Sequence, residues 1–177
     1  MTIDRASSLV DVAYAVGGAF QRAGVLAVLT GGSAATFYSD AYQSLDLDFV
    51  LSFRGASSIV VATIEGLGFA RSGSHYVHAR SRYTLDFPRG PLMIGGDEIR
   101  TWSTSQHGED TLHVLTRTDC VRDRLSAFYH WNDRSSLRSA CVVAASGTVD
   151  FDVIRDWSLR ENSSSKYAEF LRTLQLR

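Results

Sequence analysis

The chain has 177 residues, of which 45% are hydrophobic, and its formal net charge at pH 7 is -1. This composition suits one compact folded unit and excludes an intrinsically disordered chain. The small net charge excludes a general positive field for nucleic acid, and no apolar run approaches the ~18–20 residues of a membrane span.

The first third of the chain alternates helical and strand patterns. Apolar residues recur at helical spacing after Ser7 and Ser8, and either serine can cap that helix. Short apolar runs bounded by glycine or polar residues indicate strands. In order, we expect a helix to about residue 23, a strand over 25–29, a short helix over 33–39, a strand over 46–53 and a helix from 57 or 58 to 65.

The middle of the chain predicts a hairpin around Gly73-Ser74 and then a strand that Pro88 closes. We expect the hairpin strands at 69–71 and 76–80 and the following strand at 82–87. Residues 92–116 are interpreted as a loop-rich passage with one strand at 113–115.

The end of the chain is helical, with helices expected over 119–129, 133–145, 150–160 and 164–175. The predicted fold class is α+β, with a small mixed sheet, flanking helices and a helical C-terminal part. We expect residues 1–116 to form the core and residues 117–177 to pack on it.

Cys120 and Cys141 have no Cys or His neighbours at zinc-ligand spacing, and both lie in apolar, helical sequence. We therefore expect buried thiols in a reducing cytoplasm. The first twenty residues lack a basic stretch followed by a continuous apolar segment, which is not typical of a secretory signal. The expected location is the cytoplasm.

The first candidate site feature is Gly31-Gly32-Ser33, directly after the strand at 25–29. Glycines let a phosphate approach the backbone, and N–H groups at a following helix start, with the Ser33 hydroxyl, can bind it. The alternative is an ordinary strand-to-helix turn capped by Ser33.

The second feature is Asp46-Leu47-Asp48 at the start of the next strand. Alternation puts the two carboxylates on one face, with α-carbons roughly 7 Å apart. Two carboxylates suit Mg²⁺, and a two-metal site can bind both oxygens of a phosphoryl transfer. Asp86 would supply a third carboxylate and a general base if its strand pairs beside Asp46. The alternatives are solvated carboxylates at strand ends.

The order of these features resembles the DNA polymerase β-type nucleotidyltransferase superfamily. A strand leads to Gly-Gly-Ser and a short helix, and a strand with Asp-x-Asp and a later acidic residue follow. Within this superfamily the chain most resembles the small AbiEii-like bacterial nucleotidyltransferases, which include toxins of type IV toxin–antitoxin systems. The resemblance covers about residues 25 to 140. It implies a mixed sheet, two Mg²⁺ ions during catalysis and a nucleoside triphosphate donor such as ATP.

The resemblance also assigns roles in the helical part. AbiEii-like proteins often carry a lysine at the start of a helix and an aspartate near its end, and Arg122 and Asp133 are similar in position. It implies that Gly31, Gly32, Ser33, Arg122 and Asp133 bind the nucleotide. Asp46, Asp48 and Asp86 would bind metal and act in catalysis with Arg122.

The motifs do not identify the acceptor of the nucleoside monophosphate. The resemblance favours an RNA end, especially of tRNA, and a cognate antitoxin as partner. A protein side chain or a small molecule is compatible with the same chemistry, and a non-catalytic binding or partner protein is the alternative class. Arg80, Arg82 and Arg89 flank Asp86 and are candidates for binding RNA or triphosphate.

Overall fold

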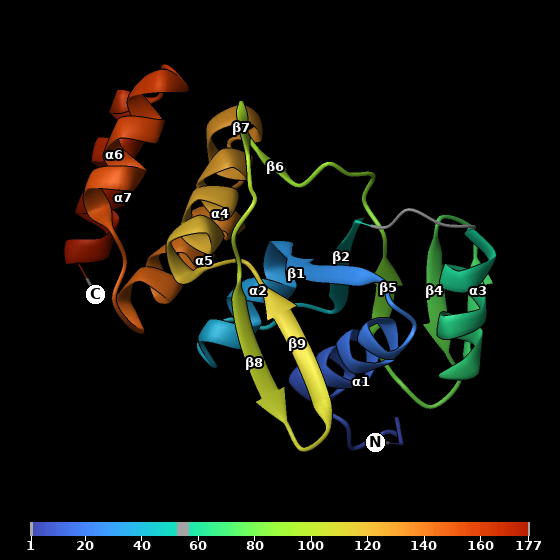
Figure 1. Cartoon of the computed structure of the whole chain (residues 1–177). Helices are drawn as coiled ribbons and strands as arrows, with labels where there is room; N and C mark the ends of the chain where they lie inside the picture. Colours follow the sequence, from blue (N-terminus) through green and yellow to red (C-terminus); the bar gives the residue numbers. More distant parts are fainter. Residues whose placement is uncertain (1, 53–56, 177) are drawn as a thin grey trace.

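The computed structural model describes residues 2–52 and 57–176. A seven-stranded mixed sheet has the strand order β3-β4-β5-β2-β1-β9-β8 (Figure 1). Its strands are β1 (Leu26–Thr30), β2 (Asp46–Ser52), β3 (Phe69–Ser72), β4 (His75–His78), β5 (Thr84–Asp86), β8 (Ser103–His107) and β9 (Asp110–Val114). A separate ribbon pairs β6 (Met93–Ile94) with β7 (Asp97–Glu98).

The helices lie on one face of the sheet and beyond its end. They are α1 (Leu9–Arg22), α2 (Gly31–Tyr38), α3 (Ser57–Gly66), α4 (Arg117–Trp131), α5 (Arg134–Ala145), α6 (Phe151–Arg160) and α7 (Ser164–Gln175). None of them, within the described part of the chain, is long and apolar enough to cross a membrane.

The centre of the sheet combines both pairing directions. β1 pairs antiparallel with β2 and parallel with β9, and β2 pairs parallel with β5. The hairpins β3–β4 and β8–β9 complete the two edges. The mixed α+β class expected from the sequence is therefore confirmed.

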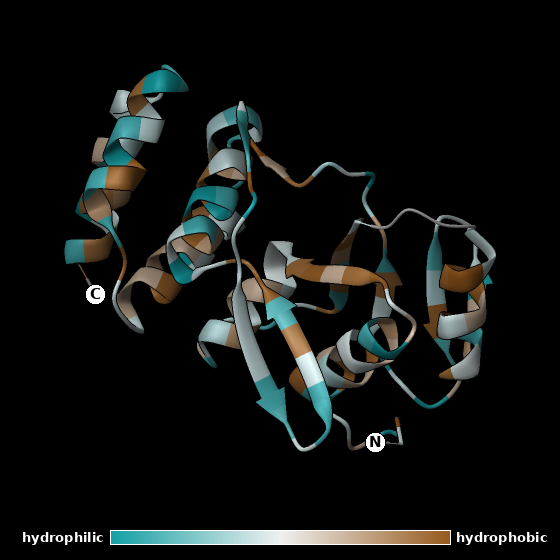
Figure 2. Cartoon of the chain, viewed as in Figure 1, coloured by the Kyte–Doolittle hydropathy of each residue, from teal (hydrophilic) through white to brown (hydrophobic). Residues whose placement is uncertain are grey.

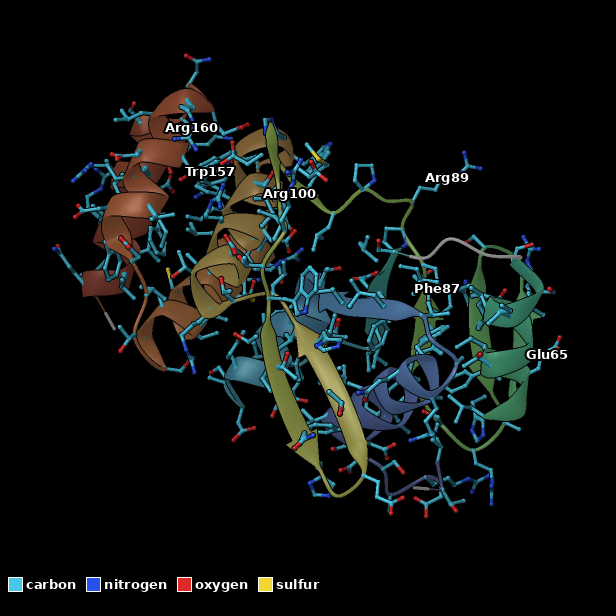
Figure 3. All side chains as sticks on the ribbon, viewed as in Figure 1. Glu65, Phe87, Arg89, Arg100, Trp157 and Arg160 are labelled. Carbon is cyan, nitrogen blue, oxygen red and sulfur yellow. The ribbon has the colours of Figure 1, made fainter. Side chains whose placement is uncertain are left out.

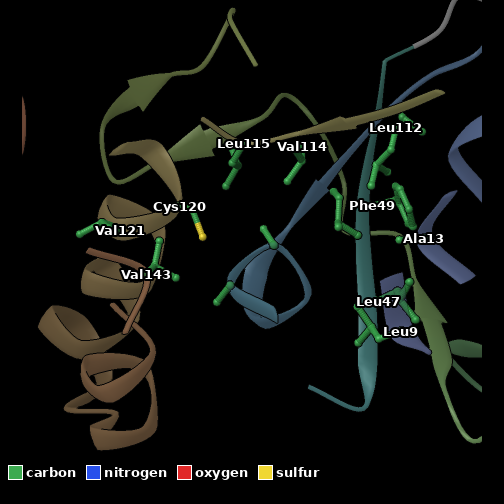
Figure 4. Packing of buried hydrophobic residues seen from close by; sticks show 14 of the residues in the cluster. Leu9, Ala13, Leu47, Phe49, Leu112, Val114, Leu115, Cys120, Val121 and Val143 are labelled. Carbon is green, nitrogen blue, oxygen red and sulfur yellow. The ribbon is translucent and has the colours of Figure 1, made fainter. Parts of the chain in front are cut away.

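The core begins between the sheet and α1 and continues into the helical end of the chain, where Phe128 and Trp157 belong to the same buried cluster. A capping box at Ser8 and Asp11 starts α1: the Ser8 hydroxyl accepts from the Asp11 N–H, and the Ser8 N–H donates to the Asp11 carboxylate. Leu47 and Phe49 point from β2 towards α1 (Figure 4) and are fully buried. Asp46 and Asp48 therefore lie on the opposite face of β2, which does not pack against α1.

The helical end of the chain packs on α2 through α4 and α5. α6 and α7 lie on the outer side of α4 and α5, away from the sheet (Figure 1). Trp157 of α6 is buried and stacks on Tyr129 of α4 with ring centroids 5.4 Å apart. Cys120 and Cys141 are buried in α4 and α5, as expected. The division at residue 116 stays a prediction, although α4 does begin at Arg117.

Residues 88–102, named the strap here, connect β5 to β8 and carry the β6–β7 ribbon beside α4 (Figure 1). Polar contacts hold the ribbon to the helical part. The Gly96 N–H donates to Glu161 at 2.9 Å, and Asp97 forms ion pairs with Arg122 and, at 2.7 Å, with Arg160. Trp157 and Arg160 lie on the side of α6 that faces the strap (Figure 3).

The loop-rich interpretation of residues 92–116 was wrong, because β8 and all of β9 lie in this range. The strand expected at 113–115 overlaps the end of β9 at residues 113 and 114. β8 reads Ser-Thr-Ser-Gln-His and lies at the sheet edge, and it has no apolar alternation. In Figure 2 β8 is pale with a teal, hydrophilic end, whereas β1 is mostly brown and hydrophobic. The expected strand over 46–53 ends at Ser52, and Phe53 lies outside the described residues.

Candidate functional site

The three predicted acidic residues lie on neighbouring parallel strands. In the β2–β5 register Asp48 is opposite Asp86, and Asp46 is opposite Thr84, whose hydroxyl donates to the Asp46 carboxylate at 2.6 Å. Asp46 and Asp48 share the face opposite Leu47, as alternation requires. The pairing on which the role of Asp86 depended is therefore confirmed.

Asp48 lies in an electrostatically unfavourable place for a carboxylate. Its pKa is raised from 3.8 to about 6. Burial is the largest cause, Arg124 opposes it, and the carboxylates of Asp86, Asp123 and Asp46 add to the rise. Each cause except Arg124 disfavours the ionised form. A cation bound beside Asp48 would relieve both the desolvation and the repulsion.

The glycine turn is built around Asp48. Gly31 has φ +65°, in the left-handed region, and a Cβ there would overlap the Asp48 carboxylate. Gly32 packs against Tyr42 and Ser44, whose hydroxyls would each be 3.1 Å from an added Cβ. A side chain is thus excluded at Gly31 and would be crowded at Gly32, and the backbone stays open beside the carboxylate.

Ser33 holds this turn in place. Its buried hydroxyl donates to the Thr30 carbonyl at 2.7 Å and accepts from the Asp48 N–H at 3.2 Å. The hydroxyl therefore links the end of β1 to β2 rather than facing open space. Its predicted contact with a nucleotide stays a prediction, whereas its contribution to the position of Asp48 is direct.

A cavity of about 550 Å³ lies over these residues. It joins the turn, Asp48 and α4 to the strap. Its lining comprises Thr30, Gly31, Asp48, Val50, Pro88, Arg89, Gly90, Pro91, Leu92, Met93, Asp123 and Arg124. Arg89 is exposed and projects outward from the strap (Figure 3). The cavity thus contains carboxylates, a glycine turn and cationic side chains.

The cation from α4 in this cavity is Arg124, not Arg122. The Arg124 side chain, 17% exposed, pairs with Asp123 at 2.7 Å and acts on Asp48 electrostatically. Arg122 instead forms ion pairs with Asp119, at 2.7 Å, and Asp97. It lies over the Trp157 ring, 5.2 Å from the centroid, and lines a different cavity.

The predicted role of Arg122 on the triphosphate therefore does not match its position, because its two terminal nitrogens are engaged by Asp119 and Asp97. Helical periodicity contained a signal for Arg124. It lies four residues after Cys120 and four before Phe128, and both of these are fully buried. A cation on that buried stripe has to meet a partner or a ligand.

Asp133 does not line the cavity either. It caps α5 by accepting from the Ser135 N–H at 2.8 Å and from the Ser136 hydroxyl at 2.6 Å. The Ser136 hydrogen bond holds the pKa of Asp133 below its usual value. Asp133 is connected to the cavity indirectly, because Arg124 is 3.5 Å from the same Ser136 hydroxyl.

The donor set fits a hard divalent cation at an open site. Within the described residues, no three His, Cys, Asp or Glu side chains form a ready-made metal-binding group. Mg²⁺ usually takes one or two carboxylates and completes its shell with phosphate oxygens and water. Asp48 and Asp86, with Asp46 two residues before Asp48, offer such carboxylates, and burial with the neighbouring carboxylates raises the pKa of Asp48 despite Arg124.

Most of the fold has a counterpart among solved structures. It is similar to the crystal structure of an antigenic nucleotidyltransferase-like protein from Paracoccidioides brasiliensis, with a TM-score of 0.61 and 13% sequence identity over 80% of this chain and 78% of that chain. The chain has a nucleotidyltransferase-type fold. No protein-family model matches it, and no curated protein matches it in sequence. The AbiEii-like subgroup stays a prediction.

Proposed function

We propose that this chain is a Mg²⁺-dependent nucleotidyltransferase that moves a nucleoside monophosphate from a nucleoside triphosphate to a hydroxyl acceptor. One observation carries the proposal: a single cavity contains the Gly31 turn, Asp48 and Arg124, and Asp48 is in register with Asp86 on the next strand. A triphosphate with its metal needs this combination of open backbone, paired carboxylates and a nearby cation.

The donor would bind at the glycine turn. The first N–H groups of α2 have no partner within the helix, and they follow the strand end beside Asp48. Arg124 would bind the phosphate oxygens and neutralise the charge of the leaving pyrophosphate. Mg²⁺, held by Asp48 and Asp86 with Asp46, would supply further positive charge at the reacting phosphate.

The transfer itself is a balanced substitution at the α-phosphorus. The acceptor oxygen forms the new bond to phosphorus, the bond to the bridging oxygen breaks, and pyrophosphate leaves with that oxygen. Asp86 would accept the proton of the acceptor hydroxyl. Ser33 would contribute by holding the Asp48 backbone, to which its hydroxyl is bonded at 3.2 Å.

We propose an RNA end as the acceptor, on the resemblance to AbiEii-like proteins, with a cognate antitoxin as partner and the cytoplasm as location. Arg89, exposed at the rim of the cavity, is a suitable contact for an RNA phosphate. A protein or small-molecule acceptor would use the same donor site.

A second candidate is a nucleotide-binding protein without transfer activity. Asp46 favours it, because its carboxylate is exposed and already accepts a hydrogen bond from Thr84 at 2.6 Å. Such a protein would bind a Mg²⁺–triphosphate complex at Asp48 and Arg124 but would release no pyrophosphate.

The test is incubation of the full chain with each α-labelled nucleoside triphosphate, Mg²⁺ and total RNA, followed by separation of RNA, protein and small molecules. Matched variants are Asp48→Asn and Asp86→Asn in the site and Asp156→Asn on the exposed surface of α6. We expect label on RNA with the unmodified chain and Asp156→Asn only. Label on protein or a small molecule would replace the RNA acceptor, and full transfer by Asp48→Asn would refute the assigned site.

A further inference from the structure

A second cavity adjoins the 550 Å³ cavity that Asp48 and Asp123 line, which we name the carboxylate cavity. Both cavities lie on the same face of the sheet. The second cavity has a volume of about 490 Å³ and lies over the start of β1 and the end of β2. Val50, Gly90, Pro91 and Leu92 line both cavities, so the strap and one strand form their common wall. A ligand that passes this wall would reach Asp48 and Arg124 from the second cavity.

The floor and one wall of the second cavity are apolar. Leu26 and Val28 of β1 and Val50 of β2 form the floor, and Trp102 from the end of the strap lies among the lining residues. The Trp102 ring contacts the His113 ring edge-on, with centroids 6.1 Å apart. His113 is itself bonded to Thr104 across β8 and β9 at 3.0 Å. The indole therefore lies against the side chains of the sheet beside it.

The rim carries opposite charges on flexible, accessible side chains. Arg100 donates through Nη2 and Nε to one Glu98 oxygen at 2.6 and 3.2 Å, and the two side chains are 80% and 45% exposed. Arg100 lies on the strap beside α4 (Figure 3). A guanidinium supplies donors and a carboxylate supplies acceptors, so this pair can exchange its mutual bonds for bonds to the edge of a heterocycle.

We propose that this second cavity is a nucleobase subsite. The base would stack on Trp102 over the apolar floor, its edge would meet Glu98 and Arg100, and the sugar and phosphates would pass the common wall towards Arg124. The volume falls in the range of about 300–1,000 Å³ that small-ligand pockets occupy. This inference rests on the proposed function, because it uses the carboxylate cavity as the phosphate site.

A nucleobase fits better than an aliphatic ligand for two reasons. The Trp102 indole offers a flat face, and stacking on an aromatic side chain is available to every base. The charged rim would leave an aliphatic group with nothing to bond, whereas a base has donors and acceptors along its edge. The base could belong to the donor triphosphate or to the acceptor nucleotide, and the two sources are separable by experiment.

The test compares ligands with and without a base by calorimetric titration of the full chain. The probes are the four nucleoside triphosphates, the four nucleoside 5′-monophosphates and inorganic tripolyphosphate, all with Mg²⁺. The variants are Trp102→Ala, Trp102→Phe and, as a control, Trp131→Ala, whose indole is 77% exposed on α4. Far-UV circular dichroism checks that each variant is folded.

We expect Trp102→Ala to weaken nucleotide binding about tenfold, because a base–aromatic stack corresponds to roughly 5- to 150-fold in affinity. Trp102→Phe keeps a ring and should lose less than about threefold, and neither variant should change tripolyphosphate binding. Loss confined to triphosphates assigns the base to the donor, and loss confined to monophosphates assigns it to the acceptor. Glu98→Gln, at an exposed position, should narrow the spread of affinities among the four bases even if Trp102→Ala fails to fold.

The subsite is refuted if both Trp102→Phe and Glu98→Gln, together with a folded Trp102→Ala, leave every nucleotide affinity within about twofold of the unmodified chain. Tripolyphosphate keeps this outcome separate from a failure of the proposed function. If tripolyphosphate with Mg²⁺ does not bind the unmodified chain at all, the phosphate site is wrong. If it binds and the base-dependent effects are missing, only the nucleobase subsite is wrong.

Discussion

Replacing Asp48 by asparagine should stabilise the metal-free protein at neutral pH while abolishing transfer. The carboxylate is partly buried beside Asp86, Asp123 and Asp46, and its pKa in the folded chain is raised from 3.8 to about 6. Ionised Asp48 therefore costs folding free energy that a neutral amide of the same shape does not.

The size of the stabilisation by Asp48→Asn follows from the raised pKa of Asp48. About two pKa units at 1.36 kcal/mol each set an upper limit of about 3 kcal/mol, and the partial exposure of the side chain reduces the expected gain to about 1–2 kcal/mol. Because the folded pKa lies above the unfolded value, the folded state binds more protons between about pH 4 and pH 6. The free energy of unfolding therefore falls as pH rises through this window.

The assay is urea unfolding followed by circular dichroism, in EDTA, at several pH values from 4 to 7.5, with Asp156→Asn as the surface control. We expect Asp48→Asn and the unmodified chain to be equally stable near pH 4 and to separate progressively up to pH 7. Addition of Mg²⁺ with tripolyphosphate should stabilise the unmodified chain more than the variant, because only the carboxylate compensates the cation. A variant that is less stable at pH 7, or a difference independent of pH, would refute the electrostatic reasoning.

Three further variants test the rest of the site. Arg124→Ala should weaken Mg²⁺–tripolyphosphate binding about tenfold or more in calorimetric titration, since it removes a charge-assisted phosphate contact; an unchanged affinity would contradict its role. Arg122→Ala should instead lower the free energy of unfolding by about 3 kcal/mol in urea, because it leaves Asp119 and Asp97 without this buried partner, and a normal stability would count against that. Gly24→Ala should cost about 1 kcal/mol for its positive φ alone, whereas Gly31→Ala should cost clearly more because of the overlap with Asp48; equal losses would exclude the overlap.

Local sequence patterns predicted many of the helices and strands. The helix expected over 164–175 coincides with α7 (Ser164–Gln175), and the hairpin predicted around Gly73-Ser74 forms as β3–β4. Apolar periodicity and turn residues act over a few residues, so they are legible in the sequence. β8 was missed because an edge strand needs only one neighbour for its hydrogen bonds and no apolar face of its own.

The candidate site also has features that local sequence predicts and features that it does not. The Gly31 turn and the common face of Asp46 and Asp48 follow from neighbours in sequence, because glycine conformation and strand alternation are local properties. The pairing of Asp86 with Asp48 joins residues 38 positions apart in the sequence, as does the neighbouring pair Thr84 and Asp46. From the sequence, the role of Asp86 could only be predicted on the condition that its strand pairs with the strand of Asp46 and Asp48.

The sequence by itself determined that a glycine turn and an acidic strand follow one another, and that a helix with several arginines comes later. Only the tertiary structure decided which arginine of that helix faces them. Arg122 and Arg124 lie about 200° apart around a helix of 100° per residue, so the rotation of α4 against α2 directs one into the strap and the other into the cavity. That rotation is set by the packing of distant buried residues such as Cys120 and Phe128, which no local pattern specifies.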